Sequence, residues 1–306
     1  MHNSHKNIDG CVATIGFFDG VHRGHRFLLQ CLKSEAQRRG LQSLVITFPE
    51  SPSSVLSPST LPPLLSTADE KRQLLLSSGI DDVAMLDFTQ ALSSMTVERF
   101  MSDVLACRFG VRVLLMGYDH RFGSDGGGSF PVYEQAGKKT GIEILRTMEY
   151  KQSESSKTNV SSSSIRNALL SGDIRSANNA LGYYYSIEGR VVGGHHVGTV
   201  LGYPTANLRA EKRKLIPANG VYAVRVVVDG NEFGGMLNIG RRPTLDNGHD
   251  ISVEVNIFDF NENIYSENIR VEFVARLREE RRFESIDSLR HQLKADEAAC
   301  RQLLKK

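Results

Sequence analysis

The sequence contains no tryptophan and only four cysteines in 306 residues. The cysteines stand far apart, in apolar or helical contexts and without the spacing of a metal site; they are Cys11, Cys31, Cys107 and Cys300. This pattern predicts buried free thiols in a reducing compartment, and it argues against a disulfide framework or a zinc site.

An excess of one charge and a long apolar run are also missing. The formal net charge is +2 and no dense run of Lys or Arg occurs, so we expect no general attraction to nucleic acid or to anionic membranes. No apolar run approaches the ~20 residues that span a bilayer, and the polar start, residues 1–5, does not resemble a signal peptide. We therefore expect a folded cytoplasmic enzyme with no nucleic-acid or membrane partner.

The first half of the chain alternates between strand-like and helix-like segments. The candidate strands cover residues 12–15, 44–48, 83–86, 111–116 and 142–145. Candidate helices lie between them, near residues 27–39, 69–77 and 97–107. This rhythm predicts an α/β fold with a parallel sheet and helices on both faces.

From Tyr185 onward the sequence changes to strand-like runs separated by Gly, Asn and Asp turns. The runs cover residues 186–192, 220–228, 236–239, 252–258 and 269–275, and they predict a small antiparallel β-barrel. Apolar residues at helical spacing after Ser285, a suitable N-cap, predict a C-terminal helix packed on the barrel. The expected domains are residues 1–184 and 185–306.

A glycine-rich turn with two histidines follows the first candidate strand. From Gly16 to His25 it reads G-F-F-D-G-V-H-R-G-H. A helix N-terminus offers unpaired N–H groups and a partial positive charge, and glycines let the backbone approach an anion. His22 and His25 could donate to the same phosphates, form a surface pair on a helix, or form a zinc site that lacks a third nearby ligand. The position directly after strand and turn favours the phosphate site.

Two more polar segments lie in the same half. Residues 160–166 read V-S-S-S-S-I-R and precede an apparent helix that stops near Gly172. They form either a linker that runs into an N-cap or a set of hydroxyl groups that, with Arg166, holds triphosphate. Residues 117–123, G-Y-D-H-R-F-G, follow the strand at 111–116, where open α/β sheets place ligands.

The second half carries a third motif, G-T-V-L-G-Y-P-T-A-N at residues 198–207. Read neutrally, it is a turn. The hydroxyl oxygen of Thr205 and the amide oxygen of Asn207 are nevertheless suitable ligands for a Mg²⁺ ion that carries ATP phosphates. Glu254 lies inside a predicted strand. A carboxylate that points into the barrel costs free energy unless it has a function there, whereas strand alternation alone favours a side chain that points to solvent.

The H-x-G-H and serine/arginine blocks resemble the signatures of the nucleotidyltransferase superfamily, with Ser163 where that superfamily has threonine. The chain as a whole resembles the bacterial bifunctional riboflavin kinase/FMN adenylyltransferase family, whose members are also called FAD synthetases. The resemblance runs in the same order through nearly the whole chain, and further blocks lie at residues 217–222, 238–244, 258–260 and 278–283. A P-T-A-N block with a downstream glutamate is typical of the kinase domain, and an H-x-G-H domain ahead of it is specific to this family.

This resemblance implies a Rossmann-like nucleotidyltransferase domain followed by a riboflavin kinase β-barrel. The barrel would phosphorylate riboflavin from MgATP to give FMN. Glu254 would draw the proton from the ribityl 5′-hydroxyl, while Thr205 and Asn207 would hold the metal and ATP. The other residues implied for this site bind ATP or flavin; they are Gly202, Pro204, Arg278 and Glu280.

The first domain would then join FMN to a second ATP, giving FAD and pyrophosphate. The transfer is in line and needs no covalent nucleophile, and His22, His25 and Arg166 would stabilise it. The residues implied to hold the nucleotide are Gly16, Phe17, Asp19, Gly24, Asp119, Ser162 and Ser163.

Several positions depart from the family pattern. Ser51 stands where the F-x-P-H-P segment has histidine, Ser164 and Thr199 stand where arginines are usual, and Ser266 stands where glycine is usual. Two alternatives therefore stay open. One is a riboflavin kinase with a weakened or altered adenylyltransferase half. The other is a flavin- or nucleotide-binding regulator without turnover, against which the retention of His22, His25, Arg166, Thr205, Asn207 and Glu254 argues strongly.

Overall fold

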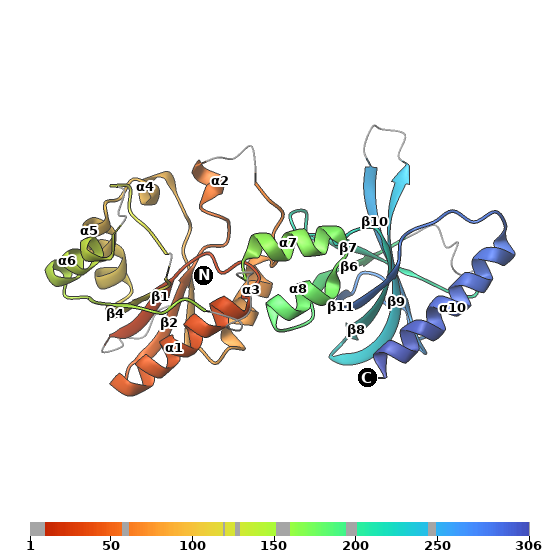
Figure 1. Cartoon of the computed structure of the whole chain (residues 1–306), viewed down its shortest axis with the longest axis horizontal. Helices are drawn as coiled ribbons and strands as arrows, with labels where there is room; N and C mark the ends of the chain where they lie inside the picture. The colour runs from red at the N-terminus through yellow and green to blue at the C-terminus, as the bar shows by residue number, and fades with distance from the viewer. Residues whose placement is uncertain are drawn as a thin grey trace. The chain divides into compact units, whose positions relative to one another are not determined.

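The computed structural model describes residues 10–56, 61–118, 120–125, 129–150, 160–193, 201–243 and 249–305, apart from the side chains of 56, 241–243 and 249–250. The chain forms two compact units, Met1–Val160 and Ser161–Lys306, whose helices and strands are drawn in Figure 1. None of the helices described is both long and apolar enough to cross a bilayer.

The first unit is built on a five-stranded parallel sheet with the strand order β3-β2-β1-β4-β5. The strands are β1 Cys11–Ile15, β2 Gln42–Thr47, β3 Asp82–Met85, β4 Val111–Met116 and β5 Glu143–Arg146. The central strands are buried almost throughout, as expected of a parallel sheet that is covered on both faces. The predicted parallel α/β fold is confirmed.

Helices cover both faces of this sheet. They are α1 Arg23–Arg39, α2 Ser53–Leu56, α3 Ala68–Leu76, α4 Gln90–Ser93, α5 Val97–Arg99, η2 Phe100–Arg108 and α6 Phe130–Thr140. Leu32 of α1 and Leu75 of α3 pack on one face, and Met101 of η2 and Tyr133 of α6 pack on the other. The helix expected at 97–107 is present, as the short α-helical turn α5 that continues as the π-helix η2.

The second unit contains a closed antiparallel barrel with the strand order β10-β7-β6-β11-β8-β9. The strands are β6 Ser186–Val192, β7 Ala206–Ala210, β8 Gly220–Val228, β9 Asn231–Pro243, β10 His249–Ile257 and β11 Asn268–Arg278. Tyr222, Leu237, Val255 and Phe273 are fully buried inside the barrel. The predicted barrel is confirmed, and β7 is a strand that the turn-like P-T-A-N sequence did not indicate.

In the described part of the barrel unit the helices are α7 Ser162–Ser171, α8 Ile174–Leu181 and α10 Ile286–Leu304. Helix α10 begins after its N-cap Ser285, as predicted, and packs on β8, β9 and β11. Its Cys300 forms a cluster with Ala223, Met236 and Phe258. Figure 1 shows α10 along the barrel, with α7 and α8 also beside the barrel strands.

Helices α7 and α8 are joined to the barrel by hydrogen bonds. The carbonyl of Leu169 accepts from the N–H of Ala218 at 3.0 Å, and the side-chain amide of Asn178 donates to the carbonyl of Phe273 at 2.9 Å. The two compact units therefore divide before α7, between residues 160 and 161. The domain boundary expected from the sequence, between residues 184 and 185, lies after α8.

The four cysteines are free thiols. Cys11 and Cys300 are buried, and burial raises the pKa of each thiol to about 12. Cys31 is half-buried and Cys107 is exposed. The prediction of burial is wrong for Cys107, because its position on η2 faces solvent.

Candidate active sites

The strand order of the first unit reverses between the adjacent strands β1 and β4. Open α/β sheets bind ligands at the carboxyl ends of the strands at such a point. The turn at residues 16–22 leaves β1, and the segment at 117–123 leaves β4. The fold thus brings two of the predicted motifs to one edge of the sheet; Asp119 itself lies outside the described residues.

The turn after β1 has an unusual backbone. Phe18, Gly20 and Val21 have φ values of 52°, 76° and 35°, and positive φ is costly for a β-branched residue such as Val21. The N–H of Val21 donates to the carbonyl of Phe18 at 3.1 Å, and that of Gly20 donates to Ser66 Oγ at 3.0 Å. Backbone strain held by such contacts is typical of functional sites.

Asp19 fastens this turn to the segment that precedes α3. Its carboxylate is 2% exposed and accepts from the backbone N–H groups of Leu65 and Ser66 at 3.0 and 3.1 Å. The described contacts of Asp19 therefore shape the turn, and its contact with nucleotide stays a prediction. The N–H of Gly16 donates to the carbonyl of Ile46 at 3.1 Å, which attaches the start of the turn to β2.

His22 and His25 meet at the start of α1. His22 is the N-cap, and its Nδ1 accepts from the N–H of His25 at 3.3 Å. The two rings stack at a centroid distance of 3.6 Å. A side chain at Gly24 would come within 3.3 Å of the His22 ring, so the glycine makes room for it.

His25 is neutral in this arrangement. Burial, followed by the charges of His22 and Lys71, holds the pKa of His25 well below its usual value. Among the described residues, no hydrogen-bond partner reaches the buried Nδ1 of His25. A neutral imidazole with an unused polar atom at a helix N-terminus suits a phosphate oxygen.

The sequence interpretation missed Lys71 of α3, which is fully buried beside this turn. Its Nζ lies 4.0 Å from the centroid of the Phe17 ring and donates to the carbonyl of Phe48 at 2.5 Å. The sequence did contain one sign that Lys71 is buried. Lys71 stands four residues before Leu75, so both lie on the same buried face of the helix.

A groove lined by aromatic residues lies at the carboxyl ends of β4 and β5, beside α1. It is lined by Phe27, Tyr118, Arg146, Thr147, Met148, Glu149 and Tyr150. The guanidinium of Arg146 lies 4.8 Å from the centroid of the Tyr118 ring, and the rings of Phe27 and Tyr150 lie 5.7 Å apart. Such a groove can accept a flat aromatic base, and the sequence interpretation did not identify it.

The serine/arginine block forms the first turns of α7. Ser161 is the N-cap and accepts from the N–H of Ser164, whose hydroxyl donates to the carbonyl of Ser161 at 2.8 Å. The N-cap interpretation is therefore confirmed, and Ser164 completes a capping box. The next residues of α7 include Ser162, Ser163 and Arg166, and they belong to the second compact unit. That they bind the same nucleotide as His22 and His25 stays a prediction.

The predicted kinase residues Asn207 and Glu254 lie opposite each other in the pairing of β7 with β10. Directly opposed residues of antiparallel strands present their side chains to the same face. Glu254 is also opposite Asn238 of β9, and Met236, two residues before Asn238, packs on α10. These three polar residues therefore share the outer face of the barrel, as strand alternation predicts for Glu254, and the role of Glu254 as a base stays a prediction.

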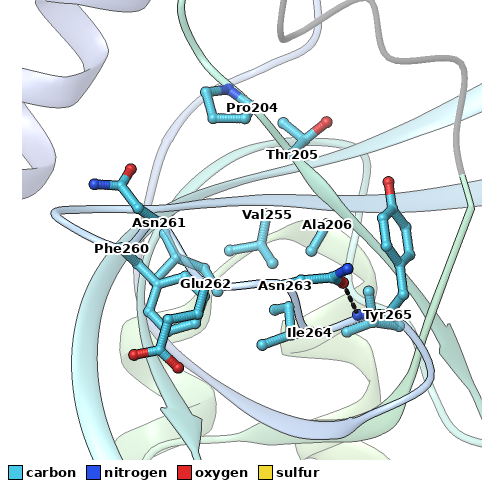
Figure 2. Close-up of a pocket in the computed structure, with 12 residues that line it drawn as sticks. Pro204, Thr205, Ala206, Val255, Phe260, Asn261, Glu262, Asn263, Ile264 and Tyr265 are labelled. Atoms are coloured by element: carbon cyan, nitrogen blue, oxygen red, sulfur yellow. Dashed lines mark hydrogen bonds between the residues drawn. The ribbon is translucent and has the colours of Figure 1, made fainter.

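Pro204 and Thr205 lie just before β7 and line a cavity of about 260 Å³. Figure 2 shows them at one side of this cavity, with Val255 and Ala206 in its wall and the loop from Phe260 to Tyr265 around it. The amide of Asn256 fixes the carbonyl of Pro204 at 2.7 Å. Gly202, with φ of 84°, forms the preceding turn.

The two predicted flavin residues have different surroundings. Arg278 is bound to Asp296 of α10, with its Nη2 2.8 Å from the carboxylate. Glu280 lies over the backbone of Gly240, where a Cβ would be 2.4 Å from its Oε1 and 3.3 Å from the amide of Asn238. Glu280 therefore reaches the face that carries Asn207 and Glu254.

Two of the remaining departures from the family pattern, Ser51 and Ser266, lie outside the helices and strands. Ser266, at the usual glycine position, has φ of 71° and ends the loop that lines the cavity. The hydroxyl of Ser51 accepts from the N–H of Ser53 at the start of α2. Thr199 lies outside the described residues.

Two family models match the chain in sequence order: FAD synthetase at residues 4–164 and riboflavin kinase at residues 181–304. Two curated relatives are named bifunctional riboflavin kinase/FMN adenylyltransferase. The one from Pseudomonas fluorescens is 39% identical and the one from Escherichia coli K12 is 36% identical, each over 99% of this chain and 96% of the relative.

A crystal structure of a Streptococcus pneumoniae protein shares the fold. It has a TM-score of 0.85 and 33% identity over 97% of this chain and 96% of that chain. It is named a macrolide-efflux protein, a description that belongs to that protein. Because both family models match and the relatives align over nearly the full length, this chain belongs to the bifunctional riboflavin kinase/FMN adenylyltransferase family.

Proposed function

We propose that this protein phosphorylates riboflavin with ATP to give FMN, and then joins FMN to the AMP part of a second ATP to give FAD and pyrophosphate. The observation that carries the proposal is the pairing of Asn207 with Glu254 on the barrel, together with a separate nucleotide turn at the switch point of the parallel sheet. Each is a polar site in its own compact unit.

In the kinase reaction the 5′-hydroxyl oxygen of riboflavin attacks the γ-phosphorus of ATP, and ADP leaves. Glu254 accepts the proton of that hydroxyl, a role typically worth ~10²–10⁴-fold in rate. Glu280 and Arg278 hold the flavin on the outer face of the barrel, and Glu280 reaches that face over Gly240.

ATP occupies the cavity beside β7 in this proposal. Gly202, Pro204 and Thr205 border the adenosine and phosphates, and Pro204 and Thr205 line the cavity. The oxygen atoms of Thr205, Asn207 and Glu254 suit Mg²⁺, which commonly takes one or two protein ligands and several phosphate oxygens. Bound there, Mg²⁺ would neutralise the phosphate charge that develops during transfer.

In the adenylyltransferase reaction a phosphate oxygen of FMN attacks the α-phosphorus of ATP, and pyrophosphate leaves. Neutral His25, capping His22 and the N-terminus of α1 bind phosphate oxygens. Arg166 offsets the charge of pyrophosphate. The other residues that hold the nucleotide are Gly16, Phe17, Asp19, Gly24, Asp119, Ser162 and Ser163.

The adenine of this second ATP lies in the aromatic groove. Phe27 and Tyr150 offer ring faces, and the groove opens at the carboxyl ends of β4 and β5 beside the start of α1. We assign the adenylyltransferase to residues 1–184 and the kinase to residues 185–306. The protein acts in the cytoplasm.

The test is product analysis after incubation with riboflavin and MgATP. The native protein should form FMN and then FAD. FMN alone would point to an inactive adenylyltransferase half, and no turnover would contradict the proposal.

Glu254→Gln separates the two reactions. It should lower FMN formation by at least ~10²-fold and leave FAD formation from supplied FMN within twofold of the native rate. Glu232→Gln, at an exposed glutamate of the same barrel, is the control and should change neither. Loss of FAD synthesis from FMN in folded Glu254→Gln protein would contradict the division between the two sites.

A further inference from the structure

Lys71 is a buried cation at the edge of the sheet where the nucleotide turn begins. Its side chain has no exposed surface, and an ammonium group away from water is costly unless it has partners. Burial lowers the pKa of Lys71 to about 8, while nearby Asp19 opposes the shift. Buried titratable groups with a shifted pKa are concentrated at functional sites, so Lys71 is a better candidate for a functional role than a surface lysine.

The contacts of Lys71 join two strand ends. Its Nζ donates to the carbonyl of Phe48, directly after β2, at 2.5 Å, and lies 4.0 Å from the ring centroid of Phe17, after β1. The carbonyl of Phe17 in turn accepts from the hydroxyl of Thr47 at 3.1 Å. Both the ring and the backbone of Phe17 are therefore fixed.

The helix that carries Lys71 is itself fastened to the turn. Helix α3 starts with a capping box between Thr67 and Glu70, and the segment just before it is held by Asp19 through Leu65 and Ser66. Lys71 thus sits on a rigid support. It can transmit that rigidity to Phe17 and to Phe48, where the chain leaves β2 and runs towards α2.

We infer that Lys71 is a positioning residue of the adenylyltransferase: its ammonium holds the turn at Phe17 and the start of the loop after Phe48 in the geometry that the transfer requires. This rests on the proposed adenylyltransferase function. Lys71 is too deeply buried to touch substrate and acts through these two neighbours. The positive charge of Lys71 also acts on His25. Among the described residues, the charges that shift the pKa values of Lys71 and His25 include those of Asp19 and His22.

The test compares Lys71→Met with Lys138→Met, an exposed lysine of α6. Methionine matches the length of lysine but has neither charge nor donor. In Lys71→Met, kcat for FAD formation from FMN and ATP should fall ~10- to 100-fold, as small misplacements of reacting groups do, while KM for ATP changes less than threefold. Riboflavin kinase activity, which the other unit carries, should stay within twofold, and Lys138→Met should match the native protein in both reactions.

Two further measurements separate positioning from a general loss of structure. The pKa of His25, followed by NMR, should rise in Lys71→Met because a positive neighbour is gone. Lys71→Arg, which keeps the charge and a donor, should recover part of kcat. Unchanged kcat in folded Lys71→Met would overturn the inference.

If circular dichroism shows that the first unit does not fold in Lys71→Met, the variant Phe17→Leu tests the inference instead. It removes the aromatic ring beside Nζ and keeps an apolar side chain, so kcat for FAD formation should fall ~3-fold or more; a kcat within twofold of native would overturn the inference. A native protein that makes no FAD would instead contradict the proposed function, a result distinguishable from either.

Discussion

At the scale of single residues, His25 links the sequence motif to measurable chemistry. The H-x-G-H spacing puts His22 at the N-cap of α1 and His25 on its first turn, and the centroids of the two stacked rings lie 3.6 Å apart. Burial, followed by the positive charges of His22 and Lys71, holds the pKa of His25 well below its usual value. In the proposed function, the imidazole of His25 and the N-terminus of α1 bind the phosphate oxygens.

This has a consequence for stability against pH. The folded-state pKa of His25 lies below the unfolded value, so below about pH 6.5 the unfolded chain binds a proton that the folded chain does not. The free energy of unfolding of the first unit should then fall as pH decreases, by up to ~1.4 kcal/mol per pH unit from this group. Urea unfolding at pH 7 and pH 5.5 should show a smaller decrease for His25→Asn than for the native protein.

The control for this prediction is His291→Asn, at an exposed histidine of the other unit. It should leave the pH dependence of the first unit unchanged. Equal pH slopes in native protein and His25→Asn would contradict the assignment of a lowered pKa to His25.

At the scale of elements, α10 connects the two sides of the kinase cavity. Glu297 accepts from the hydroxyl of Tyr203 at 3.2 Å and from Arg301 at 2.9 Å. Arg301 also binds both carboxylate oxygens of Asp259, at 2.8 and 2.9 Å. Tyr203 precedes Pro204, and Asp259 precedes the loop that forms the opposite wall.

Arg301→Met should therefore weaken ATP binding by the kinase. Asp259 is 78% exposed, so the ion pair contributes little to global stability. The expected change is a ~3- to 5-fold higher KM for ATP in FMN formation, about 1 kcal/mol, with FAD formation from FMN unaffected.

Arg290→Met on the same helix is the matched control, because its ion pair with Asp287 does not reach the cavity. Steady-state kinetics with varied ATP measures the effect. Equal KM values for native protein and Arg301→Met would show that α10 does not hold the cavity walls.

At the scale of the whole molecule, helices α7 and α8 belong to the barrel unit although α7 carries the serine/arginine motif. Several apolar side chains on these two helices are buried; they are Ile165, Leu169, Ile174, Ala177 and Leu181. Asn178 binds the backbone at both Phe273 and Tyr185. The kinase domain proposed from sequence is thus extended by two helices in the compact unit.

A fragment of residues 185–306 should be less stable than one of residues 161–306. The shorter fragment loses those apolar contacts, each worth ~1.5–3 kcal/mol for a fully buried large side chain, so its Tm should be lower by at least ~10 °C. Differential scanning calorimetry of the two fragments measures this. Equal Tm values would show that α7 and α8 add nothing to the barrel.

The sequence by itself determined the features that depend on neighbouring residues. Strand and helix alternation predicted both folds, and local chemistry predicted helix ends such as Gly172 and Ser285. The ordered motifs were sufficient to predict the family and both enzyme activities, which the family models and relatives confirm. Local spacing did not distinguish the π-helix at 100–108 from an α-helix.

Only the tertiary structure decided which distant residues meet. Strand register sets Glu254 beside Asn207, the approach of α3 buries Lys71 between Phe17 and Phe48, and packing on the barrel places α7 in the second unit. A sequence pattern reports the periodicity of one element at a time. Burial, strand register and the pKa of His25 depend on contacts between elements, and these exist only once the chain has folded.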